Sequence, residues 1–327
     1  MSAKTWLLRR LRTAMGTQAL LDRLETIDRK TNGQHQPGNG ATFQGMTVLQ
    51  GNPYAQYLMP LEYLPSRDFR PRWGYSRAPH AGLLALFERH RADYRTALDG
   101  LRELAPFFAA IDANFTLDMA PEPGWVGGAI TALDLAILYY FVCRYRPATY
   151  LEIGSGLTTC FARRAISDHK LATRVVSIDP EPRASIDVIC DEVVRAGMET
   201  VDPEIFARLQ PGDIVFMDGS HRSFMNSDVT VFMLDVLPLL KPGVIVHFHD
   251  ITLPNDYPEF FQNWYWNEQY LLAVYLLAAQ DRVRILLPVN FVTIDPELRT
   301  ALVPPLVDLG KQSESFLLGG SLWFTHT

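Results

Sequence analysis

From about residue 148 to the end of the chain, short apolar runs alternate with longer amphipathic segments. The runs are rich in β-branched and aromatic residues, as buried strands are. They lie at 150–153, 174–178, 213–217, 244–248, 282–292 and 322–325. Strands separated by helical segments of about 10 to 20 residues are typical of a parallel, doubly wound sheet. The pattern therefore predicts an α/β fold.

The segments between these strands have the apolar spacing of helices. Helices are predicted over 182–196, 228–240 and 260–279. Pro238 should kink or end the second of them, because proline cannot continue a helix. Residues 198–202 make a poor third strand, since few of them favour extended structure.

The first part of the chain lacks this alternation. Residues 1 to about 30 place apolar side chains at helical spacing behind a basic start. This suits a helix packed on its own domain, a dimerisation helix or a membrane-surface helix. Residues 31–45 are rich in Gly, Asn, Gln and Pro, as linkers are. Helices are predicted over 83–108 and 129–144, and the second is apolar nearly all round, so it should be buried.

These patterns divide the chain into three parts. Residues 1–45 are expected to form an N-terminal helix and a linker. Residues 46–124 are expected to form a helical and irregular extension that either caps a cleft or wraps the surface. Residues 125–327 are expected to form the sheet domain.

Composition and charge exclude several classes of protein. The 327 residues are 48% hydrophobic and 20% charged, so they can bury a sizeable core. A formal net charge of −6 gives no basic excess for a nucleic-acid backbone. The three cysteines form no C-x-x-C pair, which favours a reducing, cytoplasmic setting over disulfides or structural zinc. The apolar runs are too short to span a bilayer, and we expect no secretory signal.

Chemistry enters where the first strand meets Gly154-Ser155-Gly156, just before a helical pattern that begins at about Thr158. A strand that turns through glycines into a helix brings free backbone N–H groups and the positive helix end to one point. Glycine there would let a ligand approach the backbone closely. The plain alternative is an ordinary turn between a strand and a helix.

The strand ends give this stretch a context. Acidic or histidine residues lie at or just after four strands, namely Glu152, Asp179, Asp218 and the pair His249-Asp250. In a doubly wound sheet, ligands bind beyond the carboxyl ends of the strands, where the strand order reverses. Asp179 follows Gly156 by 23 residues, a spacing that suits a carboxylate on ribose hydroxyls.

A nicotinamide-dependent oxidoreductase is one alternative for such a site. Its fingerprint needs a third glycine, where this chain has Thr159. Glu152 also suits an ammonium group, or the ordered waters around one, better than a diphosphate. A hydrolase lacks support, because the spacing of a G-x-S-x-G elbow is absent.

Four stretches in order resemble the successive motifs of class I S-adenosylmethionine-dependent methyltransferases: YLEIGSGLTT, VVSIDPEP, IVFMDGSH and LLKPGVIVHFHDI. The likeness is greatest to a bacterial branch with a D-G-S-H-like motif, which includes O-methyltransferases of small molecules and sugars. It covers about residues 125–327. It implies a Rossmann-like, seven-stranded sheet whose last strand inserts antiparallel.

The resemblance also implies roles for individual residues. Gly154 and Gly156 would admit the methionine part of S-adenosylmethionine, Asp179 would hold the ribose, and Asp202 would approach the adenine. The cofactor-binding set is then Glu152, Gly154, Ser155, Gly156, Thr158, Asp179 and Asp202.

Methyl transfer to a hydroxyl needs an aligned acceptor and removal of its proton. His221 and His249 have a suitable ordinary pKa for a base, and Asp218 and Asp250 could orient it or hold a divalent cation such as Mg²⁺. Some relatives place an acidic pair after the fifth strand for a metal. Here the first member of that pair is His249, so the resemblance leaves the metal open. The plain alternative for His221 is that it only caps a turn. The plain alternative for His247 is that it packs in the core or at an interface.

Aromatic and amide side chains follow the fifth strand's acids, in the stretch Trp264, Tyr265, Trp266, Asn267, Glu268 and Tyr270. They suit a pocket for a sugar or aromatic acceptor, or a helix docked on the sheet or on a second subunit. We therefore predict an S-adenosylmethionine-dependent methyltransferase acting on an oxygen of a small molecule or glycan. A protein that binds the cofactor without transferring a methyl group is the second hypothesis. The N-terminal helix is expected to support a homo-oligomer.

Overall fold

The computed structural model describes residues 70–327 except 117–120, 128, 183, 303–305 and 309–316. The predicted N-terminal helix and linker, and the start of the predicted extension, lie outside the described residues. The sheet belongs to one compact unit, Arg70–Glu259 with Trp266–Thr327. The described part of the predicted extension, from Arg70 onward, thus lies in the same unit as the sheet.

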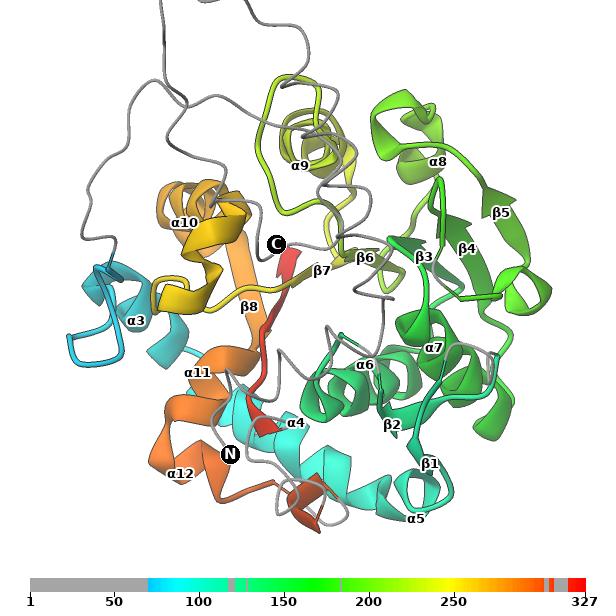
Figure 1. Ribbon diagram of the computed structural model, residues 1–327, viewed down its shortest axis with the longest axis horizontal. Helices are drawn as coiled ribbons and strands as arrows, with labels where there is room; N and C mark the ends of the chain where they lie inside the picture. Colours follow the sequence, from blue (N-terminus) through cyan, green and yellow to red (C-terminus); the bar gives the residue numbers. More distant parts are fainter. Residues whose placement is uncertain (1–69, 117–120, 128, 183, 303–305, 309–316) are drawn as a thin grey trace, which may run out of the picture. The chain divides into compact units, whose positions relative to one another are not determined.

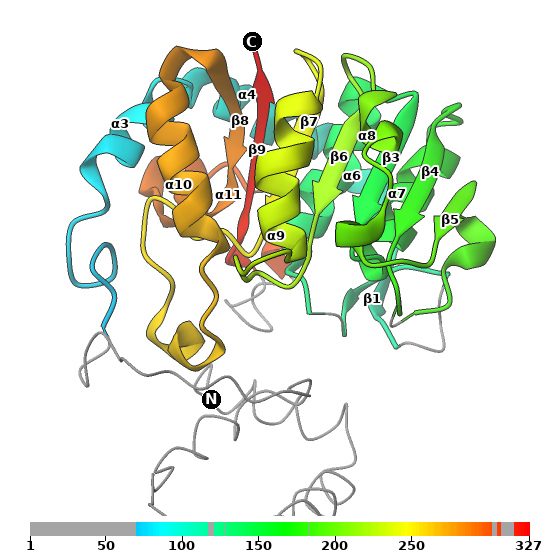
Figure 2. The same ribbon diagram turned by 90° about the horizontal axis from the view of Figure 1, so that it is seen from above.

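The unit is built on a seven-stranded sheet with the order β5-β4-β3-β6-β7-β9-β8 (Figures 1 and 2). The strands are β3 Thr149–Ile153, β4 Arg174–Ile178, β5 Glu192–Val194, β6 Ile214–Met217, β7 Ile245–His249, β8 Val283–Pro288 and β9 Ser321–His326. Neighbouring strands from β5 to β7 are parallel, whereas β9 runs antiparallel between β7 and β8. The predicted doubly wound α/β fold, with an antiparallel last strand, is confirmed.

Helices cover both faces of the sheet (Figure 1). One face carries α4 Arg91–Glu103, α6 Ala132–Tyr145 and α7 Leu157–Asp168, and the other carries α8 Glu204–Ala207, α9 Asp228–Val231 and α10 Glu268–Ala279. Helix α6 is buried over most of its length, as its apolar composition predicts. Burial on both faces explains why the central strands read as continuous apolar runs.

Strand β5 overturns two predictions. The helix predicted over 182–196 is wrong, because this segment contains the short helix η3 Asp187–Ile189 and then β5. The third strand predicted at 198–202 is also wrong, since a 3₁₀ turn, η4 Met198–Thr200, occupies it. Pairing of β5 with the edge of β4 decides the conformation, and the β-branched pair Val193-Val194 favours it.

Other elements differ from prediction in their boundaries. The helix predicted over 83–108 is divided into α3 Ala81–Glu88, α4 and α5 Ala105–Phe108, the last with Pro106 in its first turn. The helix predicted over 260–279 begins only at Glu268, after η7 Glu259–Trp264.

Two further segments are shorter or less regular than their sequence patterns predict. The run 282–292 contains β8 and then α11 Val289–Ile294. The predicted helix 228–240 starts as α9, widens into η5 Phe232–Val236 and ends in η6 Leu237–Leu239, which contains Pro238.

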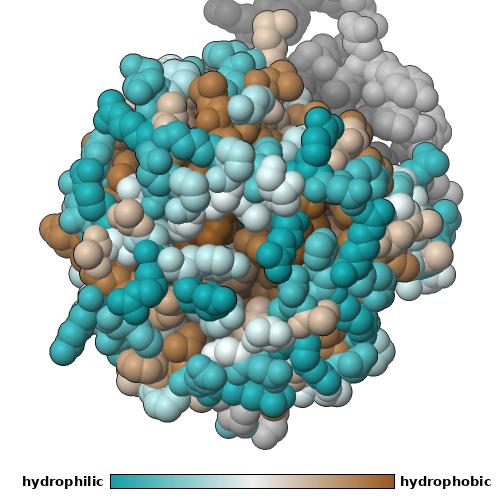
Figure 3. All heavy atoms as spheres, turned by 180° about the vertical axis from the view of Figure 1, so that it is seen from behind, coloured by the Kyte–Doolittle hydropathy of each residue, from teal (hydrophilic) through white to brown (hydrophobic). Residues whose placement is uncertain are grey.

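Two other features complete the described chain. A small parallel pair, β1 Asp112–Asn114 and β2 Gly124–Val126, leads into α6. No described helix has both the length and the apolar character needed to cross a bilayer. On the side seen in Figure 3, polar residues cover most of the described surface and hydrophobic ones show as separate patches between them.

Candidate active site

Gly154 ties together the ends of three strands. Its N–H donates to the carbonyl of Ile178 at the end of β4 (3.1 Å), and the N–H of Asp218 after β6 donates to the carbonyl of Ile153 (3.0 Å). Its φ is +82°, and a Cβ there would overlap the backbone oxygen of Asp218. Only glycine fits this conformation and this contact. It lies between β3 and β6, where the strand order reverses.

Gly156 has a different environment, although it belongs to the same turn. It precedes the first residue of α7, and a Cβ added to it would meet no described atom within 4 Å beyond its immediate neighbours. Its N–H donates to the hydroxyl of Thr159 (3.0 Å). The turn thus has one glycine required by packing and one that borders open space, which is what a ligand beside the loop requires.

Glu152 supports this turn from within the sheet. Its side chain is fully buried and accepts hydrogen bonds from the hydroxyls of Tyr150 (3.2 Å) and Thr159. Burial raises the pKa of Glu152 to about 8, against the lowering effect of hydrogen bonds from Thr158, Thr159 and Tyr150. Thr159 therefore connects the buried acid to the loop, at the position where a dinucleotide fingerprint has its third glycine. Contact of Glu152 with a cofactor stays a prediction.

Asp179 lies directly beside the glycine turn. Its Oδ2 accepts from the N–H of Ser155 and its Oδ1 from the N–H of Glu181, both at 2.8 Å. The Ser155 hydroxyl lies 2.7 Å from that of Ser177 on β4. The structure thus brings together the predicted loop and the predicted ribose-binding carboxylate. Each oxygen of Asp179 keeps a lone pair beyond its amide partner.

Asp202 is placed differently from the strand-end acids. It is exposed, and its Oδ1 accepts from the N–H of Glu204 at the start of α8. Its approach to an adenine stays a prediction. The residue after β5 is instead Arg195, which donates to the backbone oxygen of Asp179 (3.0 Å) and forms an ion pair with Asp187. The helix predicted over 182–196 gives no sign of this contact between Arg195 and Asp179.

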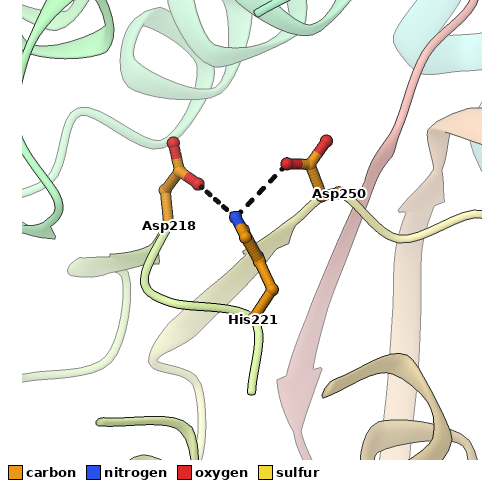
Figure 4. A group of neighbouring side chains, drawn as sticks. All are labelled: Asp218, His221 and Asp250. Carbon is orange, nitrogen blue, oxygen red and sulfur yellow. Dashed lines mark ion pairs between the residues drawn. The ribbon is translucent and has the colours of Figure 1, made fainter. Parts of the chain in front are cut away.

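A second group of polar side chains gathers at the ends of β6 and β7. The Nε2 atom of His221 lies 3.4 Å from Asp218 Oδ1 and 3.3 Å from Asp250 Oδ2 (Figure 4). His221 and Asp250 both have left-handed backbones, with φ of +60° and +53°. The carbonyl of His221 accepts from the N–H groups of Asn267 and Glu268, which ties this loop to the start of α10. Non-glycine residues held in this conformation cluster at functional sites.

Glu268 fixes the orientation of the His221 ring. Its Oε2 lies 2.9 Å from His221 Nδ1, and its side chain is fully buried. The other ring nitrogen therefore faces Asp218 and Asp250. The sequence predicts Glu268 only as part of the acceptor region, because 47 residues separate it from His221 and no spacing signals the contact.

These groups lie close enough for each to change the pKa of the others. Burial lowers the pKa of His221, but the hydrogen bond to Glu268 and the charges of Glu268, Asp250 and Asp218 outweigh it and raise the pKa to about 9. Burial also raises the pKa of Asp250 and of Glu268. Unless another cation pairs with these carboxylates, the His221 ring is therefore protonated at neutral pH.

The two histidines of β7 have different surroundings. His249 is buried, with Nε2 3.8 Å from Asp250 Oδ1. Burial lowers the pKa of His249, but the negative charges of Asp250, Asp218 and Asp134 outweigh burial. The pKa of His249 is therefore raised above its ordinary value. His247 stacks on Phe216, with ring centroids 3.6 Å apart, and burial holds its pKa well below the ordinary value. His247 thus packs in the core, as its place within the strand suggests.

One predicted acceptor-region aromatic lies against this group. The ring centroid of Trp266 is 4.2 Å from that of His221 and 6.3 Å from that of Tyr257. Tyr270 donates its hydroxyl to Asp256 and so supports the loop that follows β7. Trp264 and Tyr265 belong to the segment outside the compact unit.

Comparison with known proteins gives one family match. Residues 151–251 match the family described as a methyltransferase domain, a segment that runs from β3 to just beyond Asp250. The match supports methyl transfer as the general activity of this domain. It takes in the glycine turn, Asp179 and the His221 group.

The other comparisons add little to this assignment. No curated protein matches the chain. A solved structure from Thermobifida fusca YX, provisionally described as a methyltransferase, is 16% identical over 59% of this chain and 82% of its own, with a TM-score of 0.34. At that score the likeness carries no argument.

Proposed function

We propose that this protein is a class I S-adenosylmethionine-dependent methyltransferase that methylates an oxygen of a small molecule or glycan. The observation that carries the proposal is the open space beside Gly156, at the reversal of strand order. Asp179 borders the turn on the β4 side, and Asp218 follows β6 on the other. Both lie in the segment that matches a methyltransferase domain.

The residues around the glycine turn suit S-adenosylmethionine. When bound, this cofactor supplies a methyl group attached to a positively charged sulfur. Gly156 leaves the backbone open to it, Gly154 fixes the tight turn beside it, and Asp179 would accept hydrogen bonds from the ribose hydroxyls. The carboxylates at the neighbouring strand ends favour a positively charged ligand over a diphosphate.

The local hydrogen bonds argue against a nicotinamide dinucleotide. The N–H of Gly156, at the start of α7, already donates to the Thr159 hydroxyl. A diphosphate needs N–H groups at the helix start that are free to donate to it. The turn is therefore better suited to the cationic end of an amino acid.

The His221 group suits the acceptor end of the site. A hydroxyl acceptor would give its proton to Asp250 as its oxygen takes the methyl group. The O–H bond and the methyl–sulfur bond would break, an O–C bond would form, and S-adenosylhomocysteine would leave. Burial makes Asp250 a better proton acceptor than a surface aspartate, because it raises its pKa. The Nε2 atom of His249 lies 3.8 Å from Asp250 Oδ1. Asp218 and His221, 3.4 Å apart, would position the acceptor oxygen. Trp266 offers an aromatic face for a sugar or aromatic ring.

The proposal is tested with the full chain, tritium-labelled S-adenosylmethionine and a panel of sugar and phenol acceptors. Asp250→Asn should lower kcat by about 100-fold or more while leaving cofactor affinity within about threefold, because it removes the base and not the cofactor site. Asp235→Asn, at an exposed aspartate on η5, is the matched control. Tight cofactor binding without transfer to any acceptor would instead favour a binding protein. Full activity of Asp250→Asn would exclude the assigned base.

A further inference from the structure

Arg195 lies beside Asp179, the carboxylate proposed for the ribose of the cofactor. It directly follows β5, whose last residue, Val194, accepts a hydrogen bond from the N–H of Asp179 (3.1 Å). The Nη1 atom of Arg195 donates to the backbone oxygen of Asp179 (3.0 Å). The main chain of Asp179 is therefore held at its N–H by β5 and at its carbonyl by the residue that follows β5.

The same guanidinium is linked to the glycine turn through two serine hydroxyls. Nη1 of Arg195 lies 3.4 Å from Ser177 Oγ, and Ser177 Oγ lies 2.7 Å from Ser155 Oγ. Both serines are buried, and the N–H of Ser155 donates to Asp179 Oδ2 (2.8 Å). Arg195 thus connects the backbone of Asp179 with the residue that contacts its carboxylate. Linked hydrogen bonds in a buried setting strengthen one another and restrict the groups that make them.

Asp187 on η3 sets the direction of this guanidinium. It forms an ion pair with Nη2 of Arg195, whose side chain is 30% exposed. Surface ion pairs contribute little to stability. A guanidinium is planar, however, and holds its donors in fixed directions, so a partner on Nη2 also fixes where Nη1 points. These contacts are better suited to orienting Asp179 than to stabilising the fold.

We propose that Arg195 is a positioning residue of the cofactor site, which holds Asp179 so that its carboxylate meets the ribose hydroxyls of S-adenosylmethionine. The inference rests on the proposed function for its ligand, whereas the placing of Asp179 is a property of the ligand-free chain. Lysine cannot substitute for Arg195, because an ammonium group lacks the rigid fork that contacts Asp179 and Asp187 together.

Amide hydrogen exchange of the ligand-free chain tests the positioning step. The N–H of Ser155 is protected by its bond to Asp179, so Arg195→Gln should speed its exchange by about tenfold. Arg174→Gln is the matched control, because Arg174 begins β4 at the opposite edge of the sheet and pairs with Glu192 on β5 (3.3 Å). Unchanged exchange in Arg195→Gln, or the same increase in both variants, would overturn the positioning role.

Calorimetry of the full chain tests the consequence for the cofactor. Arg195→Gln and Arg195→Lys should each raise the Kd for S-adenosylhomocysteine by about tenfold, and Arg174→Gln should change it by less than about twofold. With an analogue that lacks the 2′ and 3′ hydroxyls, the effect of Arg195→Gln should fall below about twofold, because Asp179 then has no ribose hydroxyl to bind.

The two experiments distinguish failure of this inference from failure of the proposed function. Equal losses of affinity for both ligands in Arg195→Gln would overturn the role, since Arg195 would then act on the fold as a whole. An unmodified chain that binds no adenosyl compound would contradict the proposed function, and the exchange of the Ser155 N–H would still decide whether Arg195 positions Asp179.

Discussion

Replacing each glycine of the turn by alanine separates the demands of folding from those of ligand binding. Gly154 has a φ of +82°, where a side chain costs about 1–2 kcal/mol. Its new Cβ would also overlap the backbone oxygen of Asp218, and relieving such overpacking typically costs about 1–3 kcal/mol more. Gly154→Ala should therefore lower the free energy of unfolding by about 2–5 kcal/mol.

Gly156→Ala should have the opposite profile. The added methyl group meets no described atom within 4 Å beyond its neighbours. The free energy of unfolding should change by less than about 1 kcal/mol, because the methyl group displaces no packed atom. The methyl group would occupy room that the cofactor needs. A cost of about 1–3 kcal/mol there corresponds to a Kd for S-adenosylmethionine raised about 5- to 150-fold.

Urea denaturation measures the free energy of unfolding of each variant, and isothermal titration calorimetry measures its Kd for S-adenosylmethionine. The reasoning is refuted if Gly156→Ala binds S-adenosylmethionine as the unmodified protein does. It is equally refuted if the two variants lose the same stability, since the open space beside Gly156 would then not exist.

Three further variants test single residues around the site. Glu152→Gln should remove a pH dependence of the free energy of unfolding. The Glu152 carboxyl has a pKa of about 8 in the folded chain and 4.5 in the unfolded chain. Its contribution to stability is therefore complete below pH 4.5 and is lost as the pH rises through 8. Urea denaturation at pH 5 and pH 8 should show a loss of roughly 3–5 kcal/mol from this group in the unmodified protein and none in the variant, and equal slopes would contradict the assignment. Asp179→Asn should raise the Kd for S-adenosylmethionine by about tenfold in calorimetry, because the amide loses the charge and one acceptor, and an unchanged Kd would remove Asp179 from the site. Asp134→Asn should lower the free energy of unfolding by about 1–3 kcal/mol, because the buried carboxylate accepts from Thr131, Gly320 and Ser321; unchanged denaturation would show that these bonds contribute nothing.

The sequence predicts the parts of this fold that burial dictates. Strands β3, β4, β6 and β7 are short apolar runs enclosed on both faces, so their composition alone identifies them. Because parallel strands end at one edge of the sheet, it also follows that Asp179, Asp218 and Asp250 share an edge with the glycine turn.

Pairing across the fold decides what the sequence cannot show. Strand β5 is a three-residue edge strand whose conformation comes from its bonds to β4, whereas its local pattern alone predicts a helix. Glu268 reaches His221 because α10 begins beside the loop after β6. Likewise, nothing in the motif signals that Thr159 connects Gly156 to the buried Glu152.

Calorimetric titration of the full chain with S-adenosylmethionine, S-adenosylhomocysteine and NAD tests the central claim most directly. We predict that the first two bind at one site per chain and that NAD does not bind, because the turn offers an opening beside Gly156 and no free N–H on that glycine for a diphosphate. Binding of NAD, with no binding of either adenosyl compound, would contradict the assignment of this turn to a methyltransferase.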